Sequence, residues 1–187
     1  MSAPLTLSDL LQIVAGFERR ALELYRYFAQ VFAAHPTAGR IWRAMSDAEA
    51  GHFAVLRLAE DRLPAVGSTT EVDRRFDEGR LEEWESTIKE LEAKGRRPEI
   101  DPAEAAEITL TWEREELPRL LALLADLPEP ARQRTAAGLV EGAEEHLCSL
   151  KELLKAVGSD HLLPEISRIE ESLSHLRHLA AGKPSDL

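Results

Sequence analysis

The sequence predicts an all-α protein built around a bundle of four long helices that form two hairpins. Apolar residues recur at alternating spacings of three and four along most of the chain, as on one face of an amphipathic helix. Prolines and glycines separate these stretches, and we find no convincing strand pattern between them. The 187 residues suffice for one domain with a sizeable core, so we expect a single domain over 1–187.

The first hairpin is expected over 7–63. Its first helix, at about 7–33, ends at His35-Pro36, because proline disfavours helical geometry in the residue before it. The second helix is expected at about 37–63. The predicted buried stripes are Leu7, Leu11, Val14, Glu18, Ala21, Tyr25, Phe28 and Phe32 on the first helix, and Trp42, Met45, Glu49, His52, Leu56, Ala59 and Leu63 on the second.

A long crossover is expected to join the two hairpins over 64–101. The segment is rich in charged residues, yet four apolar residues keep helical spacing within it, which predicts an exposed helix. These residues are Leu81, Trp84, Ile88 and Leu91. Asp101-Pro102 marks the start of the next helix, because aspartate is a good N-cap and proline fits the first helical turn.

The second hairpin is expected over 102–157. It consists of a third helix at about 102–125, a turn at 127–130 and a fourth helix that ends near 157. The segment 158–187 is expected to hold a fifth amphipathic helix and a tail. The predicted stripes are Ala106, Thr109, Glu113, Glu116, Leu120 and Leu123 on the third helix, Leu139, Ala143, His146, Leu150, Leu153 and Val157 on the fourth, and Leu162, Ile166, Ile169, Leu173, Leu176 and Ala180 on the fifth.

Three glutamates interrupt the apolar stripes of three different helices. Glu18, Glu49 and Glu113 each lie near the middle of a predicted helix, so folding is expected to bring their carboxylates to a similar height near the bundle axis. Buried carboxylates are costly unless they are paired or bind a metal ion. His52 lies one turn beyond Glu49, and neutral imidazole is a ligand for iron, manganese or zinc. The pattern therefore predicts a metal site.

The two hairpins look like copies of each other. Glu18 and Glu49 are 31 residues apart (49 − 18), and Glu113 and Glu144 are also 31 residues apart (144 − 113). Di-iron carboxylate bundles take one glutamate from each of two helices and a Glu-x-x-His pair from each of the other two. Here Glu18 and Glu113 match the single glutamates, and Glu49-x-x-His52 matches one pair.

On these residues the sequence resembles the rubrerythrin branch of the ferritin-like family. The family commonly has a second glutamate on the third helix, and Glu113-x-x-Glu116 has that spacing. The resemblance covers the two hairpins and implies a ferritin-like four-helix bundle with a di-iron centre. Rubrerythrins proper also have a rubredoxin-like domain with an iron bound by four cysteines, which this sequence lacks because Cys148 is its single cysteine.

The fourth helix departs from the family pattern. Glu144 takes the place opposite Glu49, but the nearest histidine, His146, is only two residues away, and residues two apart diverge by about 200° on an ideal helix. Either a local bulge brings both to one ion, or the second half of the site is degenerate. Pro118 is expected to kink the third helix near the site. The candidate metal ligands are Glu18, Glu49, His52, Glu113, Glu116, Glu144 and His146.

Composition and charge exclude several classes of function. The net charge of −11 and the pI near 5.1 argue against a nucleic-acid partner, because the average field repels phosphates. No run approaches the roughly 18 apolar residues of a membrane span, and the N-terminus lacks a secretory signal pattern. We therefore expect a cytoplasmic protein without a membrane partner.

Three functional hypotheses follow from these residues. By resemblance, the first is a non-haem di-iron peroxidase or ferroxidase that reacts with peroxide or oxygen and takes electrons from a separate donor, with manganese or zinc as alternative metals. The second is a non-catalytic protein that stores, delivers or senses metal ions through a degenerate site. The third is an interaction bundle whose charged crossover and fifth helix bind a partner. Apolar stripes on the crossover helix and the fifth helix also suggest a homodimer.

Overall fold

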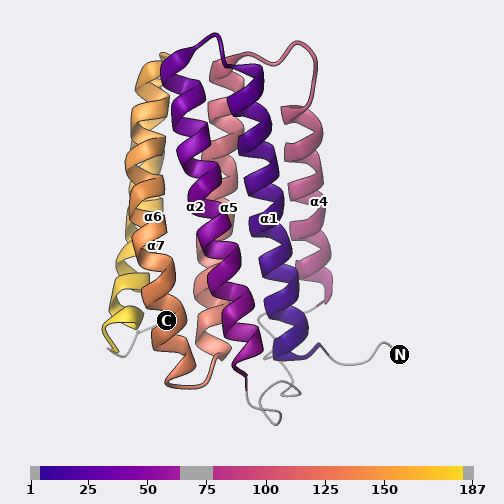
Figure 1. The fold of residues 1–187 in the computed structure, drawn as a ribbon, viewed down its shortest axis with the longest axis vertical. Coiled ribbons are helices and arrows are strands. Elements are labelled where there is room, and N and C mark those ends of the chain that lie inside the picture. The colour runs from indigo at the N-terminus through magenta and orange to yellow at the C-terminus, as the bar shows by residue number, and fades with distance from the viewer. Residues whose placement is uncertain (1–4, 64–77, 183–187) are drawn as a thin grey trace.

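A computed structural model describes residues 5–63 and 78–182 of the chain (Figure 1). Its secondary structure elements are all helices, which confirms the predicted all-α fold. The first part of the predicted crossover, 64–77, lies outside the described residues. The elements are α1 (Leu7–Val31), α2 (Pro36–Asp61), α4 (Glu78–Gly95), α5 (Pro102–Asp126), α6 (Ala131–Ala156), the 3₁₀-helix η2 (Asp160–Glu165) and α7 (Ile166–Ala180).

Four of these helices surround a common core. The helix α1 packs against α2, α2 against α6, α6 against α5, and α5 against α1. Two further helices cover this bundle from outside: α4 packs against α1 and α5, and α7 packs against α5 and α6 (Figure 1). The core therefore lies between α1, α2, α5 and α6, and each added helix covers the line along which two of them meet.

Capping residues explain where the bundle helices begin. Thr6 is the N-cap of α1, because its hydroxyl accepts a hydrogen bond from the Asp9 amide at 3.2 Å and the Asp9 carboxylate accepts one from the Thr6 amide at 3.0 Å. His35-Pro36 follows the end of α1, and the His35 imidazole caps α2 by accepting from the Ala38 amide. The structure confirms that this dipeptide separates the two helices.

The third bundle helix, α5, starts where the sequence predicts and continues through its internal proline. Asp101 is the N-cap, and its side chain accepts a hydrogen bond from the Glu104 amide at 2.9 Å. Pro118 lies inside α5, which stays helical to Asp126. Arg119 makes two contacts with the helical turn around the proline. Its guanidinium donates hydrogen bonds to the backbone carbonyl and to the side-chain carboxylate of Glu115.

The crossover helix α4 is docked on the bundle by its apolar stripe. Trp84 is 1% exposed and its ring centroid lies 3.9 Å from that of Phe17 on α1. Arg20 of α1 reaches α4 and donates to Glu85 at 2.7 Å and to Glu92 at 2.6 Å. This corrects the expectation of an exposed crossover helix, because α4 buries Trp84, Ile88 and Leu91 of the predicted stripe and partly buries Leu81.

The helix α7 also packs on the bundle through its apolar side, because its five large apolar residues are buried. Both stripes that suggested a homodimer are thus covered within the chain, and they no longer argue for a second copy. No helix in 5–63 or 78–182 is long and apolar enough to cross a membrane.

Replacing Trp84 by alanine tests the docking of α4. Because Trp84 is almost fully buried, we expect the free energy of unfolding to fall by about 3–5 kcal/mol, measured by urea denaturation. Leu58→Ala is the control, since Leu58 is 46% exposed and its loss is expected to change stability by no more than about 0.5 kcal/mol. A Trp84→Ala protein as stable as the wild type would show that α4 does not pack as described.

Candidate metal centre

Acidic and imidazole side chains from all four bundle helices meet in the core. Five of them are at least 96% buried, and the Glu113 side chain is 12% exposed. Such a group is rare, because ionisable side chains are seldom buried without partners. The cluster consists of Glu18 on α1, Glu49 and His52 on α2, Glu113 and Glu116 on α5, and His146 on α6.

Glu49 lies between the two histidines. Its Oε2 atom is 3.2 Å from His52 Nδ1, and its Oε1 atom is 3.5 Å from His146 Nδ1. The two imidazole rings have their centroids 5.2 Å apart. Each oxygen of one carboxylate therefore faces a different imidazole, which divides the cluster into two halves that share Glu49.

The first half of the cluster combines carboxylates from three helices with one imidazole. Glu18 Oε2 lies 3.5 Å from His52 Nδ1. One ligand atom from each of Glu18, Glu49, His52 and Glu116 lies within 4.8 Å of the others. Because Glu49 and His52 are three residues apart on α2, they share one face of that helix. This half therefore offers three carboxylates and one nitrogen to a single ion.

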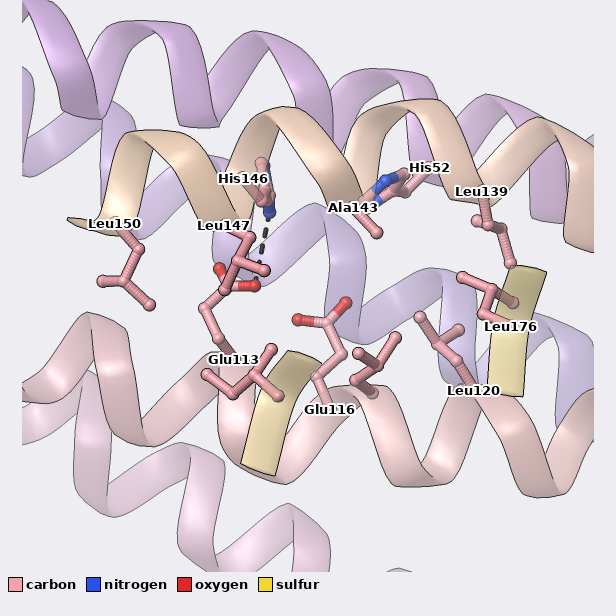
Figure 2. A pocket seen from close by; sticks show the side chains of 12 residues that line it. His52, Glu113, Glu116, Leu120, Leu139, Ala143, His146, Leu147, Leu150 and Leu176 are labelled. Carbon is pink, nitrogen blue, oxygen red and sulfur yellow. Dashed lines mark hydrogen bonds and ion pairs between the residues drawn. The ribbon is translucent and has the colours of Figure 1, made fainter. Parts of the chain in front are cut away.

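The second half is built around His146. Its Nε2 atom lies 3.1 Å from the Met45 carbonyl, and since a carbonyl only accepts, Nε2 carries the proton. The other nitrogen, Nδ1, faces Glu113 Oε2 at 3.3 Å and Glu49 Oε1 at 3.5 Å; Figure 2 marks the contact with Glu113. The backbone thus fixes the tautomer that leaves Nδ1 available as a metal ligand.

Tyr25 supports the second half from α1. It is fully buried, and its hydroxyl donates a 2.7 Å hydrogen bond to Glu113 Oε1. Burial, followed by the charge of the Glu113 carboxylate, raises the pKa of Tyr25 well above its ordinary value, so the hydroxyl stays a donor. Tyr25 is therefore a core residue, as its place on the predicted buried stripe indicates, and also a donor to a candidate ligand.

Several buried atoms of the cluster have no hydrogen-bond partner among the described residues. Burial, followed by repulsion from neighbouring carboxylates, raises the pKa of Glu49 and Glu116 well above the usual range. Burial opposes ionisation of Glu18 as well, but the adjacent His52 lowers the pKa of Glu18 to about 2. The unpartnered atoms are both carboxylate oxygens of Glu18, Glu49 Oε1, His52 Nε2 and Glu116 Oε2. A shared cation would satisfy the carboxylate oxygens together, whereas His52 Nε2 lies against the α6 backbone at Gly142.

The spacing of the donor atoms fits a transition-metal ion. Two ligand atoms that each lie about 2.0–2.2 Å from one ion are about 2.8–3.6 Å apart at angles between 90° and the tetrahedral angle. The four imidazole–carboxylate separations in the cluster run from 3.2 to 3.5 Å. Mixed imidazole and carboxylate donors suit iron, manganese and zinc. The residues present therefore fit such an ion.

The structure does not bring Glu144 into the cluster, which corrects its place in the predicted ligand set. Its side chain is 45% exposed and accepts a 2.7 Å hydrogen bond from Arg177 on α7. The reason is the divergence of about 200° between residues two apart on a helix. No bulge compensates for it, because α6 is α-helical from Ala131 to Ala156. Only His146 of that pair points inward.

Gly142 is a residue of the site that the sequence analysis did not predict. A Cβ atom built on Gly142 would lie 2.3 Å from His52 Nε2, so the imidazole packs directly against the α6 backbone. A glycine inside a helix costs about 1 kcal/mol relative to alanine, and that cost was the signal available in the sequence. Gly142 therefore makes the room that His52 needs in order to face Glu49.

Comparisons with known proteins give no independent assignment of this site. No protein-family model, curated protein or solved structure matches the chain. The interpretation of the cluster therefore depends on its residues, their burial and the distances between their donor atoms.

Two glycine substitutions test the contact between His52 and α6. Gly51→Ala is expected to raise the free energy of unfolding by about 0.5–1 kcal/mol, because Gly51 is helical and has open space around it. Gly142→Ala is expected to lower it, because the added methyl group displaces His52. Urea denaturation of the metal-free proteins measures both. Equal stabilisation by the two alanines would contradict the described packing.

The hydrogen bond from Tyr25 is tested by removing its hydroxyl. Tyr25→Phe leaves Glu113 without its donor and is expected to lower the free energy of unfolding by about 1–3 kcal/mol. Tyr27→Phe removes the same group from a half-buried residue outside the cluster and is expected to have less effect. If both variants unfold at the same urea concentration, Tyr25 does not support Glu113.

Proposed function

We propose that this chain is a ferritin-like metalloprotein that binds two metal ions, most simply iron, and uses them to reduce dioxygen or hydrogen peroxide. The observation that carries the proposal is the position of Glu49, whose two oxygens face two different imidazoles. Each imidazole also faces a carboxylate of its own, Glu18 for His52 and Glu113 for His146. A bridging carboxylate between two such pairs is the arrangement expected of a dinuclear site.

The packing of the helices supports a ferritin-like bundle. In that arrangement two antiparallel hairpins are joined by one long crossover connection. Here α1 and α2 form the first hairpin, α5 and α6 form the second, and the connection between them includes α4. Each helix of one hairpin packs against one helix of the other, α1 against α5 and α2 against α6.

The two proposed ions would have different ligands. Glu18, His52 and Glu116 would hold the first ion together with Glu49. Glu113 and His146 would hold the second, and Glu49 would be shared because Glu49 and Glu113 both face His146 Nδ1. The first position is richer in carboxylates, which favour the ferric state, and each position keeps one imidazole, which suits the ferrous state. This chemistry favours iron, with manganese or zinc as the other ions that the donors accept.

Bound iron would supply two electrons to the oxidant, one from each ion. The chain's own residues prepare the site for this. The Met45 carbonyl orients His146, Tyr25 holds Glu113, and burial keeps bulk water away from Glu18 and Glu49. The sequence has one cysteine and so contains no four-cysteine iron centre, which is why we assign re-reduction to a separate electron donor.

A second candidate function is metal binding without catalysis. It is favoured by the outward position of Glu144, which pairs with Arg177 and leaves the second ion with fewer protein ligands than the first. A weak or vacant second position would give a mononuclear site. A mononuclear site is better suited to storage, delivery or sensing of a metal ion than to a two-electron reaction.

Metal loading separates the two candidates. After anaerobic loading with Fe(II), elemental analysis is expected to give two ions per chain. Specific binding to the folded state is expected to raise the unfolding free energy by about 2.7 kcal/mol when the free ion is at a hundred times its dissociation constant. One ion per chain and no oxidation by either oxidant would favour the non-catalytic function. Less than one ion and no stabilisation would contradict both.

Matched variants assign the ligands in the same assay. His146→Ala is expected to leave one ion per chain, and Glu49→Gln is expected to weaken both positions because Glu49 faces both imidazoles. Glu144→Gln is the control, since Glu144 lies on the surface and its loss is expected to leave the stoichiometry unchanged. Loss of an ion from Glu144→Gln would show that α6 binds metal differently from the description above.

A further inference from the structure

A hollow on the surface between α5 and α7 borders the cluster from outside. Glu113 lies in its wall, and it is the least buried residue of the cluster, with 12% of its side chain exposed. The hollow shares Glu113, Leu117 and Ile169 with a second pocket, which lies between α5, α6 and α7 and is walled partly by the cluster (Figure 2). The hollow and the pocket therefore adjoin, and Glu113 borders both.

The hollow is large enough for a small organic molecule. Its volume is about 290 Å³, and one water molecule needs about 10–15 Å³ by the same measure. Leu117, Pro118 and Ile169 supply the apolar part of the wall, and charged or hydroxyl side chains supply the rest. A molecule that fits both parts has an apolar body and at least one polar group.

Arg168 and Ser172 supply free hydrogen-bond donors to the hollow from α7. They are four residues apart, so they share one face of the helix. Neither side chain has a hydrogen-bond or ion-pair partner among residues 5–63 and 78–182. A guanidinium and a hydroxyl on one face suit a carboxylate, because its two oxygens accept hydrogen bonds from both.

The charges around the hollow favour a ligand with one negative charge. Arg114 is already paired with Glu165 at 2.7 Å, and Glu115 is paired on α5 itself. Arg168 therefore supplies the one uncompensated positive charge among the described residues of the wall. The carboxylates of Glu113 and Glu115 would repel the second charge of a phosphate dianion.

We propose that the hollow binds a small organic monocarboxylate. Its carboxylate accepts hydrogen bonds from Arg168 and Ser172, and its apolar body packs on Leu117 and Ile169. The consequence rests on the proposed function, because Glu113 would hold the second ion and also borders the hollow. An organic monocarboxylate is then the class of substrate that the hollow presents to this ion.

Sodium benzoate tests the site in the metal-free full chain. Methyl resonances of Leu117 and Ile169 are expected to shift saturably, and Arg168→Gln is expected to raise the dissociation constant about tenfold or more. Arg43→Gln is the matched control, because Arg43 is an exposed arginine on α2 outside the hollow, and its affinity is expected to equal that of the wild type. Absence of saturable shifts, or equal weakening by the two variants, would overturn the site.

The second donor is tested by Ser172→Ala. The loss of a neutral donor is expected to weaken benzoate binding less than Arg168→Gln does. Arg168 is exposed and Ser172 is half-buried, so both variants are expected to unfold at the urea concentration of the wild type. Unchanged benzoate affinity in Ser172→Ala would overturn the hydrogen bond assigned to this hydroxyl.

Two further probes test the chemical class of the ligand. Benzyl alcohol keeps the ring of benzoate but lacks the charge, whereas inorganic phosphate is charged but lacks the apolar body. Each is expected to bind about tenfold more weakly than benzoate, or weaker still. Equal affinity for benzyl alcohol would overturn the role of Arg168, and equal affinity for phosphate would overturn the choice of a carboxylate.

The position of the ligand beside the second ion is tested with metal-loaded protein after free ions are removed. Ring protons of benzoate are expected to relax faster with the Mn(II)-loaded protein than with the Zn(II)-loaded protein, because unpaired electrons accelerate the relaxation of nearby nuclei. Arg168→Gln is expected to reduce this difference. Equal relaxation with the two metals, in protein that holds two ions per chain, would overturn the ligand as a substrate of the centre.

The benzoate and metal-loading assays separate the carboxylate site from the proposed function. Benzoate binding by a chain that takes up no metal would overturn the proposed function and leave the carboxylate site in place. Uptake of two ions by a chain that does not bind benzoate would overturn the carboxylate site and leave the dinuclear centre in place.

Discussion

The burial of carboxylates and imidazoles together in one bundle core is the constraint on which the rest of this molecule depends. Glu18, Glu49 and Glu116 lose nearly all contact with water, and their mutual repulsion adds to the cost of burying each. The surrounding helices must therefore supply enough apolar burial to hold the bundle closed around them. Protons can relieve part of the repulsion, but only a cation would also satisfy the unpartnered carboxylate oxygens together.

The two halves of the cluster reach a similar donor set by different routes. On α2, the glutamate and the histidine are three residues apart and share a face. On α6, the corresponding glutamate is turned to the surface and His146 alone faces inward, oriented by the Met45 carbonyl. Repeat symmetry in the sequence therefore does not become symmetry of the site, because a change of one residue in spacing rotates a side chain by about 100°.

The outer helices α4 and α7 turn a four-helix bundle with open seams into an enclosed one. Arg20 and Trp84 fix α4 against α1, while the apolar side of α7 packs across α5 and α6. The second covering also forms a pocket beside the cluster, between α5, α6 and α7. Exclusion of water matters for the proposed chemistry, since water kept out of the site neither competes with the oxidant for the proposed metal ions nor screens the charges of the ligands.

By itself, the sequence determined the helices, their breaks and the inward side of each, because a period of 3.6 residues records which side chains share a face. That information placed all six residues of the cluster on predicted buried stripes. These are Glu18, Glu49, His52, Glu113, Glu116 and His146. Only the tertiary structure decided that α4 and α7 cover their own bundle, that Gly142 lies against His52, and which oxygen of Glu49 faces which imidazole. Periodicity gives the rotation of a side chain about its own helix axis, whereas contacts between helices also depend on the height and separation of their axes, which packing sets.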